Sequence, residues 1–79
     1  MKTSRDVSSD RLIRHLVRNW DYMVDRQTGS HILLESQTPA RHCVPVPLRK
    51  AIGLGLFRDI LDQVSKAKGI PVEEILRDL

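Results

Sequence analysis

The order in which hydrophobic periodicities change along the chain is the feature that most constrains its fold. A helix-type stripe comes first, made of Leu12, Ile13, Leu16 and Val17. Stretches that alternate bulky and polar residues follow, and a second helix-type stripe runs from residue 56 to residue 64. Because 79 residues leave room for one modest core, these segments are expected to share it. We predict a single domain, 1–79, with residues 1–7 as a frayed lead-in.

Cap and turn residues set the boundaries of these segments. Ser8 or Ser9 is placed to cap the first helix, and Gly69 supplies the left-handed stop that commonly ends a helix. Clusters of turn residues at 27–30 and 37–40 separate the strands. The predicted elements are a helix to Asn19, strands at 20–26, 31–35 and 41–46, an irregular connection at 47–55, a helix at 56–68 and a short helix after Pro71.

This order predicts an α+β fold with the elements α-β-β-β-α and one more short helix. Strands joined by short turns are antiparallel, and two helices with one apolar face each need a common surface to cover. We therefore expect a three-stranded antiparallel sheet with the helices on one face. The covered face of the first strand should carry Trp20, Tyr22 and Val24, and Pro45 indicates that the third strand is an edge strand or ends there.

Three arginines of the first helix, Arg11, Arg14 and Arg18, lie opposite its apolar stripe. We expect them to form a solvated face, and we expect His15 to lie on the surface as well. The single cysteine, Cys43, is expected to be a small buried hydrophobe in the third strand.

The distribution of charge suggests a polyanionic partner. The net charge is +3, and nine of the thirteen cations are arginines, whose planar fork suits phosphate. The basic excess lies in residues 1–50, which carry nine basic and five acidic residues. No apolar run is long enough to span a membrane, and no secretory signal or internal disulfide framework is expected. We predict a cytoplasmic protein with no membrane association.

His31 is the strongest candidate for catalytic chemistry, because it directly follows a glycine turn. An imidazole titrates near neutral pH and can exchange a proton with a ribose 2′-hydroxyl or a leaving 5′-oxygen. Gly29 would let backbone amides approach a phosphate closely, and Ser30 could donate a further hydrogen bond. By its spacing alone, however, a single histidine after a turn is more often structural than catalytic.

Other constellations lack essential parts. His31, His42 and Cys43 could approach across two strands, but they form no paired-ligand motif, so no metal is predicted. Cys43 as a nucleophile with a histidine base is conceivable but disfavoured. The sequence Gly53-Leu54-Gly55 lacks the longer glycine pattern and the lysine of a phosphate-binding loop, so we predict no nucleotide cofactor.

The string Arg26-Gln27-Thr28-Gly29-Ser30-His31 resembles the arginine-glutamine-x-glycine-serine-histidine signature of the HicA family of toxin messenger-RNA endonucleases. The likeness extends over residues 8–79, and its most specific part is the glycine-serine-histidine stretch. It includes Val44-Pro45, the segment 55–61 and the tail 69–76.

This resemblance implies a double-stranded-RNA-binding-domain-like fold, ribosome-independent cleavage of messenger RNA, and neutralisation by a HicB-type antitoxin that covers the active site. His31 corresponds to the family's catalytic histidine, and Gly29 and Ser30 match the motif residues that set its turn. The chain departs from the family in two places. It has Val46-Pro47-Leu48 where a loop histidine is common, and Trp20-Asp21 where a small-residue turn is usual.

The resemblance, taken with these features, implies the toxin of a type II toxin-antitoxin system, a metal-independent endoribonuclease without a cofactor. His31 would act as general acid or base, and His42, Tyr22 or water would be its partner. The candidate contacts to RNA are Gly29, Ser30, Arg26, Thr28, Arg49 and Lys50. The alternatives are a non-catalytic RNA-binding module of the same fold and a domain whose only ligand is a protein.

Overall fold

The helices and strands follow the predicted order. A computed structural model describes residues 7–79, in which the elements are α1 (Ser9–Asn19), β1 (Met23–Thr28), β2 (His31–Ser36), β3 (His42–Pro47), α2 (Leu54–Lys68) and α3 (Val72–Leu76). The predicted α+β class and the order α-β-β-β-α-α are therefore confirmed. None of the helices in the described range is long and apolar enough to cross a membrane.

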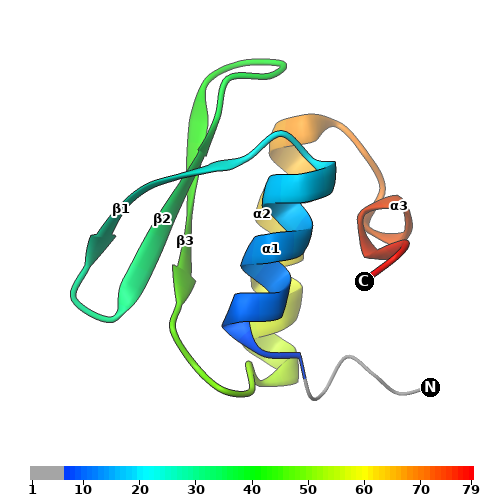
Figure 1. The fold of residues 1–79 in the computed structure, drawn as a ribbon. Coiled ribbons are helices and arrows are strands. Elements are labelled where there is room, and N and C mark those ends of the chain that lie inside the picture. The colour runs from blue at the N-terminus through cyan, green and yellow to red at the C-terminus, as the bar shows by residue number, and fades with distance from the viewer. Residues whose placement is uncertain (1–6) are drawn as a thin grey trace.

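The sheet is antiparallel throughout, with the strand order β1-β2-β3. Both α1 and α2 lie on the same side of it and contact β3, as Figure 1 shows. Pro45 thus belongs to an edge strand, where a residue without an N–H is tolerated. The side chains of β1 are exposed along its whole length, because this strand lies at the edge far from the helices.

Apolar side chains from the helices, β2, β3 and the connecting segments build the core. Its buried members are Val7, Leu12, Leu16, Tyr22, Leu34, Val44, Val46, Ile52, Phe57, Ile60, Leu61, Val64 and Ile75. The prediction that Val7 belongs to a frayed lead-in is wrong, since Val7 is 2% exposed and its carbonyl accepts a hydrogen bond from the Ile52 amide at 2.8 Å. The other six residues of that predicted lead-in lie outside the described range.

The first strand begins later than predicted. Trp20 ends α1 as its C-cap, and Asp21 takes a left-handed φ of 60° that redirects the chain before β1 starts at Met23. Tyr22 is buried as expected, whereas Val24 is 53% exposed. The prediction for Val24 was wrong because the helices do not reach β1. Side chains on both faces of this strand are therefore exposed.

Two further predictions about burial were wrong. His15 is 6% exposed rather than on the surface, because α3 folds back onto α1 and covers it. Cys43 is exposed rather than buried. Strand alternation explains this result, since Val44 and Val46 point into the core and their neighbour Cys43 must point away from it.

The helix caps largely follow the sequence signals. Ser8 is the N-cap of α1, and its hydroxyl accepts the Arg11 amide at 3.1 Å. Gly69 ends α2 with the expected left-handed φ of 69°. The one difference is that α2 starts two residues earlier than predicted, at Leu54, after Gly53 as N-cap.

Candidate nucleic-acid interface

The turn between β1 and β2 is tighter than predicted. Strand β1 extends to Thr28, which pairs with His31, so that only Gly29 and Ser30 form the connection. Gly29 has a φ of 60° and Ser30 has no positive φ, a sign pattern typical of a type II′ hairpin turn. The Gln27 side-chain amide donates to the Gly29 carbonyl at 3.1 Å. The motif Gly-Ser-His therefore forms a short, backbone-defined tip of the hairpin.

A bulge in β1 decides which side chains share a face with His31. The register shifts between Val24 and Arg26, so Asp25 has no partner on β2. Because side chains alternate along a strand, this extra residue puts Arg26 and Thr28 on the face that also carries His31. Thr28 lies directly opposite His31, and Arg26 is its diagonal neighbour, opposite the next-but-one residue of β2. This face of the sheet points away from the helices, and we call it the open face.

The ring of His31 is unpaired among the described residues. The residue is exposed, and within residues 7–79 its ring nitrogens have no hydrogen-bond partner. Among residues 7–79, the only ion pair of Arg26 is with the carboxylate of its neighbour Asp25, at 3.6 Å between Nε and Oδ2. Both side chains can therefore reach a ligand that approaches the hairpin tip. We call Arg26, Thr28, Gly29, Ser30 and His31 the turn end of the sheet.

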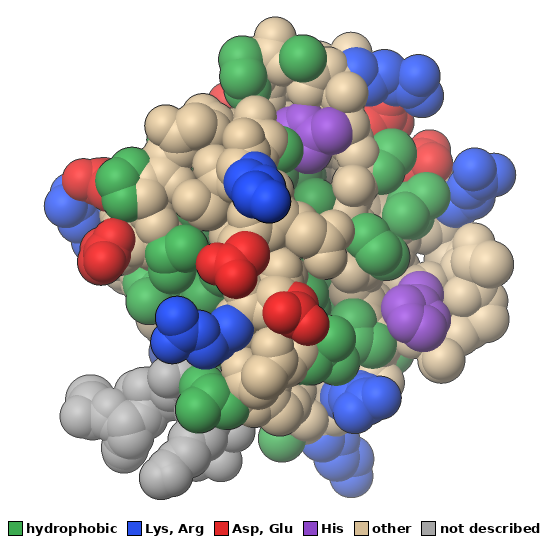
Figure 2. Space-filling view, turned by 180° about the vertical axis from the view of Figure 1, so that it is seen from behind, with side chains coloured by type: hydrophobic (Ala, Val, Ile, Leu, Met, Phe, Trp, Pro, Cys, Tyr) green, Lys and Arg blue, Asp and Glu red, His purple; other side chains and the backbone are tan. Residues whose placement is uncertain are grey.

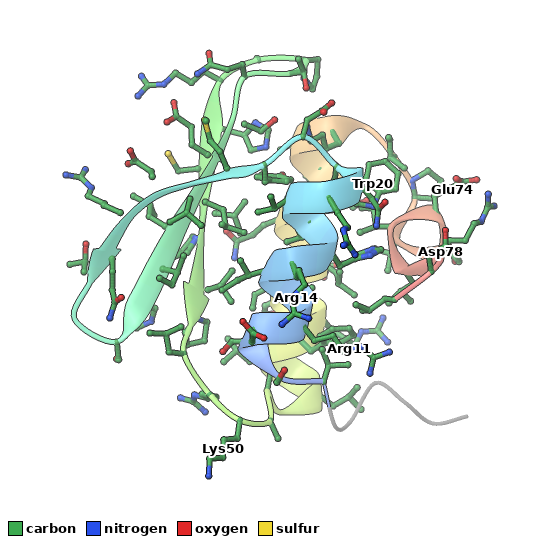
Figure 3. The ribbon with its side chains drawn as sticks, in the orientation of Figure 1. Arg11, Arg14, Trp20, Lys50, Glu74 and Asp78 are labelled. Atoms are coloured by element: carbon green, nitrogen blue, oxygen red, sulfur yellow. The ribbon has the colours of Figure 1, made fainter. Side chains whose placement is uncertain are left out.

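The segment after β3 runs beside this tip. The amide of Leu48 donates to the Ser30 carbonyl at 2.8 Å, which joins the turn to the chain just before Arg49 and Lys50. The backbone of Arg49 is held at the start of α1, where its amide donates to the Ser9 hydroxyl at 2.9 Å. Figure 3 shows Lys50 pointing away from the molecule. Neither basic side chain makes a hydrogen bond or an ion pair with the hairpin among the described residues, so it is the backbone that brings them near the turn end.

His42 and Tyr22 lie at the opposite end of the sheet. His42 pairs with Ser36, five residues along β2 from His31, a separation of about 17 Å. The Tyr22 hydroxyl lies 2.7 Å from Nε2 of His42, and Nδ1 of this ring lies 2.7 Å from the Ala40 carbonyl. Since a carbonyl only accepts, Nδ1 carries a proton and donates it there. Neither residue can serve the same phosphodiester as His31.

Lys68, in the last turn of α2, completes this second cluster. Its ammonium donates to the Ser36 hydroxyl at 2.7 Å and to the Thr38 carbonyl at 2.8 Å, and it lies 4.8 Å from the centre of the Tyr22 ring. Burial raises the pKa of Tyr22 to about 12, and burial also lowers the pKa of Lys68. We call Tyr22, Ser36, Thr38, His42 and Lys68 the loop-end cluster.

The candidate metal and nucleophile constellations are separated by the strand register. Cys43 pairs with Glu35, so neither it nor His42 lies near His31. Within the described part of the chain, no group of three or more His, Cys, Asp or Glu side chains could hold a metal ion. The structure thus brings together Arg26, Thr28 and His31 but not the histidine-cysteine set.

The basic charge is distributed rather than gathered. Figure 2 shows Lys and Arg side chains at several separate places on the face it displays, with Asp and Glu between them. On the open face Arg41 is paired with Glu35 at 2.5 Å, and this hydrogen bond is the main cause of the raised pKa of Arg41. The positive charge at the turn end therefore comes from a few local side chains rather than from a broad basic surface.

Comparison of the chain with protein-family models, curated proteins and solved structures finds no significant match. The likeness to HicA toxins thus remains a hypothesis based on the turn motif.

Proposed function

We propose that this protein binds RNA at the turn end of the sheet and cleaves it through His31 without a metal. The observation that carries the proposal is the exposed imidazole of His31, which has no partner within residues 7–79 and shares the open face with Arg26 and Thr28. A histidine that only stabilised the fold would be expected to make a hydrogen bond, as His15 and His42 do.

The reaction is an internal transfer at one phosphodiester. The ribose 2′-oxygen loses its proton and attacks the adjacent phosphorus, and the bond from phosphorus to the 5′-oxygen breaks. The products are a 2′,3′-cyclic phosphate and a 5′-hydroxyl. His31 either takes the first proton or supplies the last one, and Arg26 and Lys50 would neutralise flanking phosphates. Water is the partner for the other proton, because His42 and Tyr22 are about 17 Å away along the strands.

The biological setting follows from the resemblance alone. A HicA-like toxin acts on messenger RNA in the cytoplasm and is silenced by a HicB-type antitoxin. For this chain such a partner would have to cover the hairpin tip, because that is where His31 and Ser30 are exposed. Co-expression with the product of an adjacent reading frame would then suppress both toxicity and RNA cleavage.

Cleavage of single-stranded RNA in the presence of a chelator tests the catalytic proposal. The wild-type protein should yield products ending in 2′,3′-cyclic phosphate, and His31→Ala should yield none above background. RNA of the same sequence with 2′-deoxy sugars should remain intact, because it lacks the attacking hydroxyl. Equal cleavage by His31→Ala would exclude a catalytic role for His31. Cleavage of the deoxy substrate would exclude attack by the 2′-hydroxyl.

One observation favours a second function, RNA binding without turnover. The titratable residues first considered as the second acid or base, Tyr22 and His42, are engaged with each other far from His31. Under this alternative the protein binds RNA in a salt-sensitive way, yet a long digestion gives no product and overexpression is not toxic. Failure to bind RNA even at low salt would instead favour a domain that recognises only a protein.

A further inference from the structure

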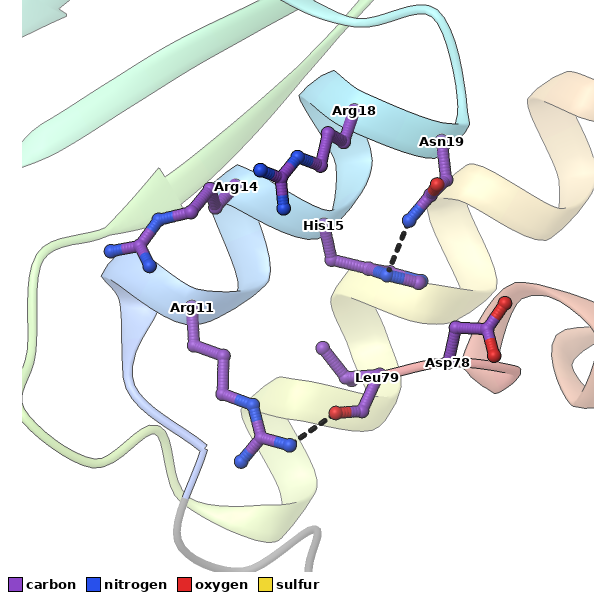
Figure 4. Close-up of a pocket in the computed structure, with 7 residues that line it drawn as sticks. All are labelled: Arg11, Arg14, His15, Arg18, Asn19, Asp78 and Leu79. Atoms are coloured by element: carbon purple, nitrogen blue, oxygen red, sulfur yellow. Dashed lines mark hydrogen bonds between the residues drawn. The ribbon is translucent and has the colours of Figure 1, made fainter.

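The exposed face of α1 contributes to a pocket that the sequence did not indicate. Arg11, Arg14 and Arg18 are spaced so that they share one side of the helix, and their Cα atoms span about 10 Å along its axis. The tail after α3 folds back beside them, as Figure 4 shows. The resulting surface pocket has a volume of about 180 Å³ and is lined by Arg11, Arg14, His15, Arg18, Asn19, Asp78 and Leu79.

His15 forms the buried wall of this pocket. Its Nε2 lies 2.6 Å from the Ile75 carbonyl, and its Nδ1 lies 3.1 Å from the Asn19 side-chain nitrogen. Because the carbonyl only accepts, Nε2 carries the proton and donates it, and Nδ1 accepts from the Asn19 amide. Both ring nitrogens are therefore used within the fold. His15 fixes α3 against α1, and the positive charge of the pocket comes from the arginines.

The arginines of the pocket are only partly neutralised. Arg14 pairs with Asp10 on the same helix, and Arg11 donates to a main-chain oxygen of Leu79, the last residue of the sequence. Arg18 has neither a hydrogen bond through its side chain nor an ion pair with any residue in the range 7–79. Asp78 adds a side-chain carboxylate to the lining, and Arg18 is the guanidinium group of the pocket left without a partner among residues 7–79. The pocket thus contains guanidinium N–H groups that can donate to the oxygens of a ligand, and those of Arg18 are available.

We propose that this pocket binds an oxyanion of the phosphate class, held mainly by the guanidinium fork of Arg18 with Arg11 beside it. Planar guanidinium groups match the oxygens of phosphate, and the pocket suits one phosphate group rather than a whole nucleotide, since pockets for larger ligands usually exceed about 300 Å³. The site lies on the helical side of the fold, whereas His31 lies on the open face of the sheet. It is therefore independent of the proposed cleavage chemistry.

Titration of the protein with inorganic phosphate, followed by amide NMR at constant ionic strength, tests the site. The expected result is a saturable shift of the signals from Asn19 and Arg18. The variant Arg18→Gln should bind about tenfold more weakly, because it loses a charge-assisted hydrogen bond. Arg58→Gln is the matched control, since this arginine is exposed on α2 outside the pocket. Non-saturating shifts, or equal weakening by both variants, would overturn the proposal.

A second titration, with a single-stranded RNA in which 2′-deoxy sugars prevent the proposed cleavage, distinguishes the two sources of such a phosphate. If the phosphate comes from an RNA backbone, Arg18→Gln should reduce the slope of log K against log salt by about 0.7. If the RNA slope is unchanged while binding of inorganic phosphate is lost, the pocket takes a small free phosphate. Both results support an oxyanion site, and neither depends on whether His31 cleaves RNA.

Discussion

The two ends of the sheet contain similar polar residues in opposite situations. At the loop end, both ring nitrogens of His42 are engaged, by Tyr22 and by the Ala40 carbonyl, and Lys68 joins α2 to the β2–β3 loop. At the turn end, His31 is exposed and its ring has no partner within residues 7–79. The difference indicates that the loop-end polar groups stabilise the fold, whereas His31 at the turn end is the group that we propose reacts with RNA.

The difference arises from what lies behind each end. Beneath the loop end, Tyr22 and the last turn of α2 supply a buried surface, so a polar group there must be satisfied internally. His31, Arg26 and Thr28 at the turn end lie on the open face, which points away from the helices, and all of β1 is exposed. Four predictions test this contrast, beginning with the largest expected effect.

Ionisation of Tyr22 should report the buried loop-end cluster directly, because this is the chain's only tyrosine. Its pKa is raised from 10.0 to about 12 in the folded protein, since burial favours the neutral phenol. The resulting stabilisation is complete below pH 10 and is lost as the pH rises towards 12. Tyrosinate absorbance should therefore rise with a midpoint near pH 12 in buffer and near pH 10 in denaturant. Identical midpoints would mean that the ring is not buried.

Lys68→Met should lower the free energy of unfolding by about 1–3 kcal/mol, because the buried Ser36 hydroxyl and the Thr38 carbonyl lose a charged donor. Urea denaturation measures this loss. The matched control is Lys66→Met, on the same helix but exposed and without such contacts among the described residues. An equal change in both variants would show that Lys68 does not hold the loop.

Gly29→Ala should cost about 1–2 kcal/mol, because a left-handed φ of 60° is unfavourable for a residue with a Cβ. Nothing lies within 4 Å of the added Cβ, so the penalty is purely conformational. Gly55→Ala, inside α2, should be neutral or slightly stabilising. Thermal unfolding of both variants checks this contrast, and a neutral Gly29→Ala would contradict the assigned turn geometry.

Arg26→Gln should leave stability within about 0.5 kcal/mol of wild type, because the side chain is exposed and its one ion pair in the described part of the chain is with Asp25. Its effect should appear in RNA binding, where the slope of log K against log salt should fall by about 0.7. Fluorescence anisotropy with a labelled single-stranded RNA measures this slope. The control Arg77→Gln removes an exposed arginine of the tail and should leave the slope unchanged. Equal slopes for wild type and Arg26→Gln would show that Arg26 does not contact the RNA.

Most of the fold was predictable because it depends on local signals. The apolar stripe of α1, the Gly69 stop and the turn at Gly29 each act within a few residues, and they fix the element order. The burial of individual side chains, in contrast, depends on tertiary packing and could not be predicted from the periodicity. The burial of His15 requires α3 to return across α1, and the exposure of Val24 reflects helices that end short of β1.

The candidate site was only partly predictable for a similar reason. The motif located His31 at a turn, but the bulge at Asp25, which puts Arg26 on the same face, has no signal in the alternation pattern. The pairing of His42 with Tyr22 depends on a contact across 20 residues. The phosphate-class pocket combines α1 with the tail, so no local motif could indicate it.

A paired comparison of His31→Gln and His42→Gln tests the central contrast most directly, with RNA cleavage in chelator and thermal unfolding measured on each variant. We predict that His31→Gln loses at least about a hundredfold in cleavage rate and melts like wild type. His42→Gln should keep the wild-type rate per folded molecule and lose about 1 kcal/mol of stability. Cleavage at the wild-type rate by His31→Gln would contradict the account, as would a loss of stability in that variant equal to that of His42→Gln.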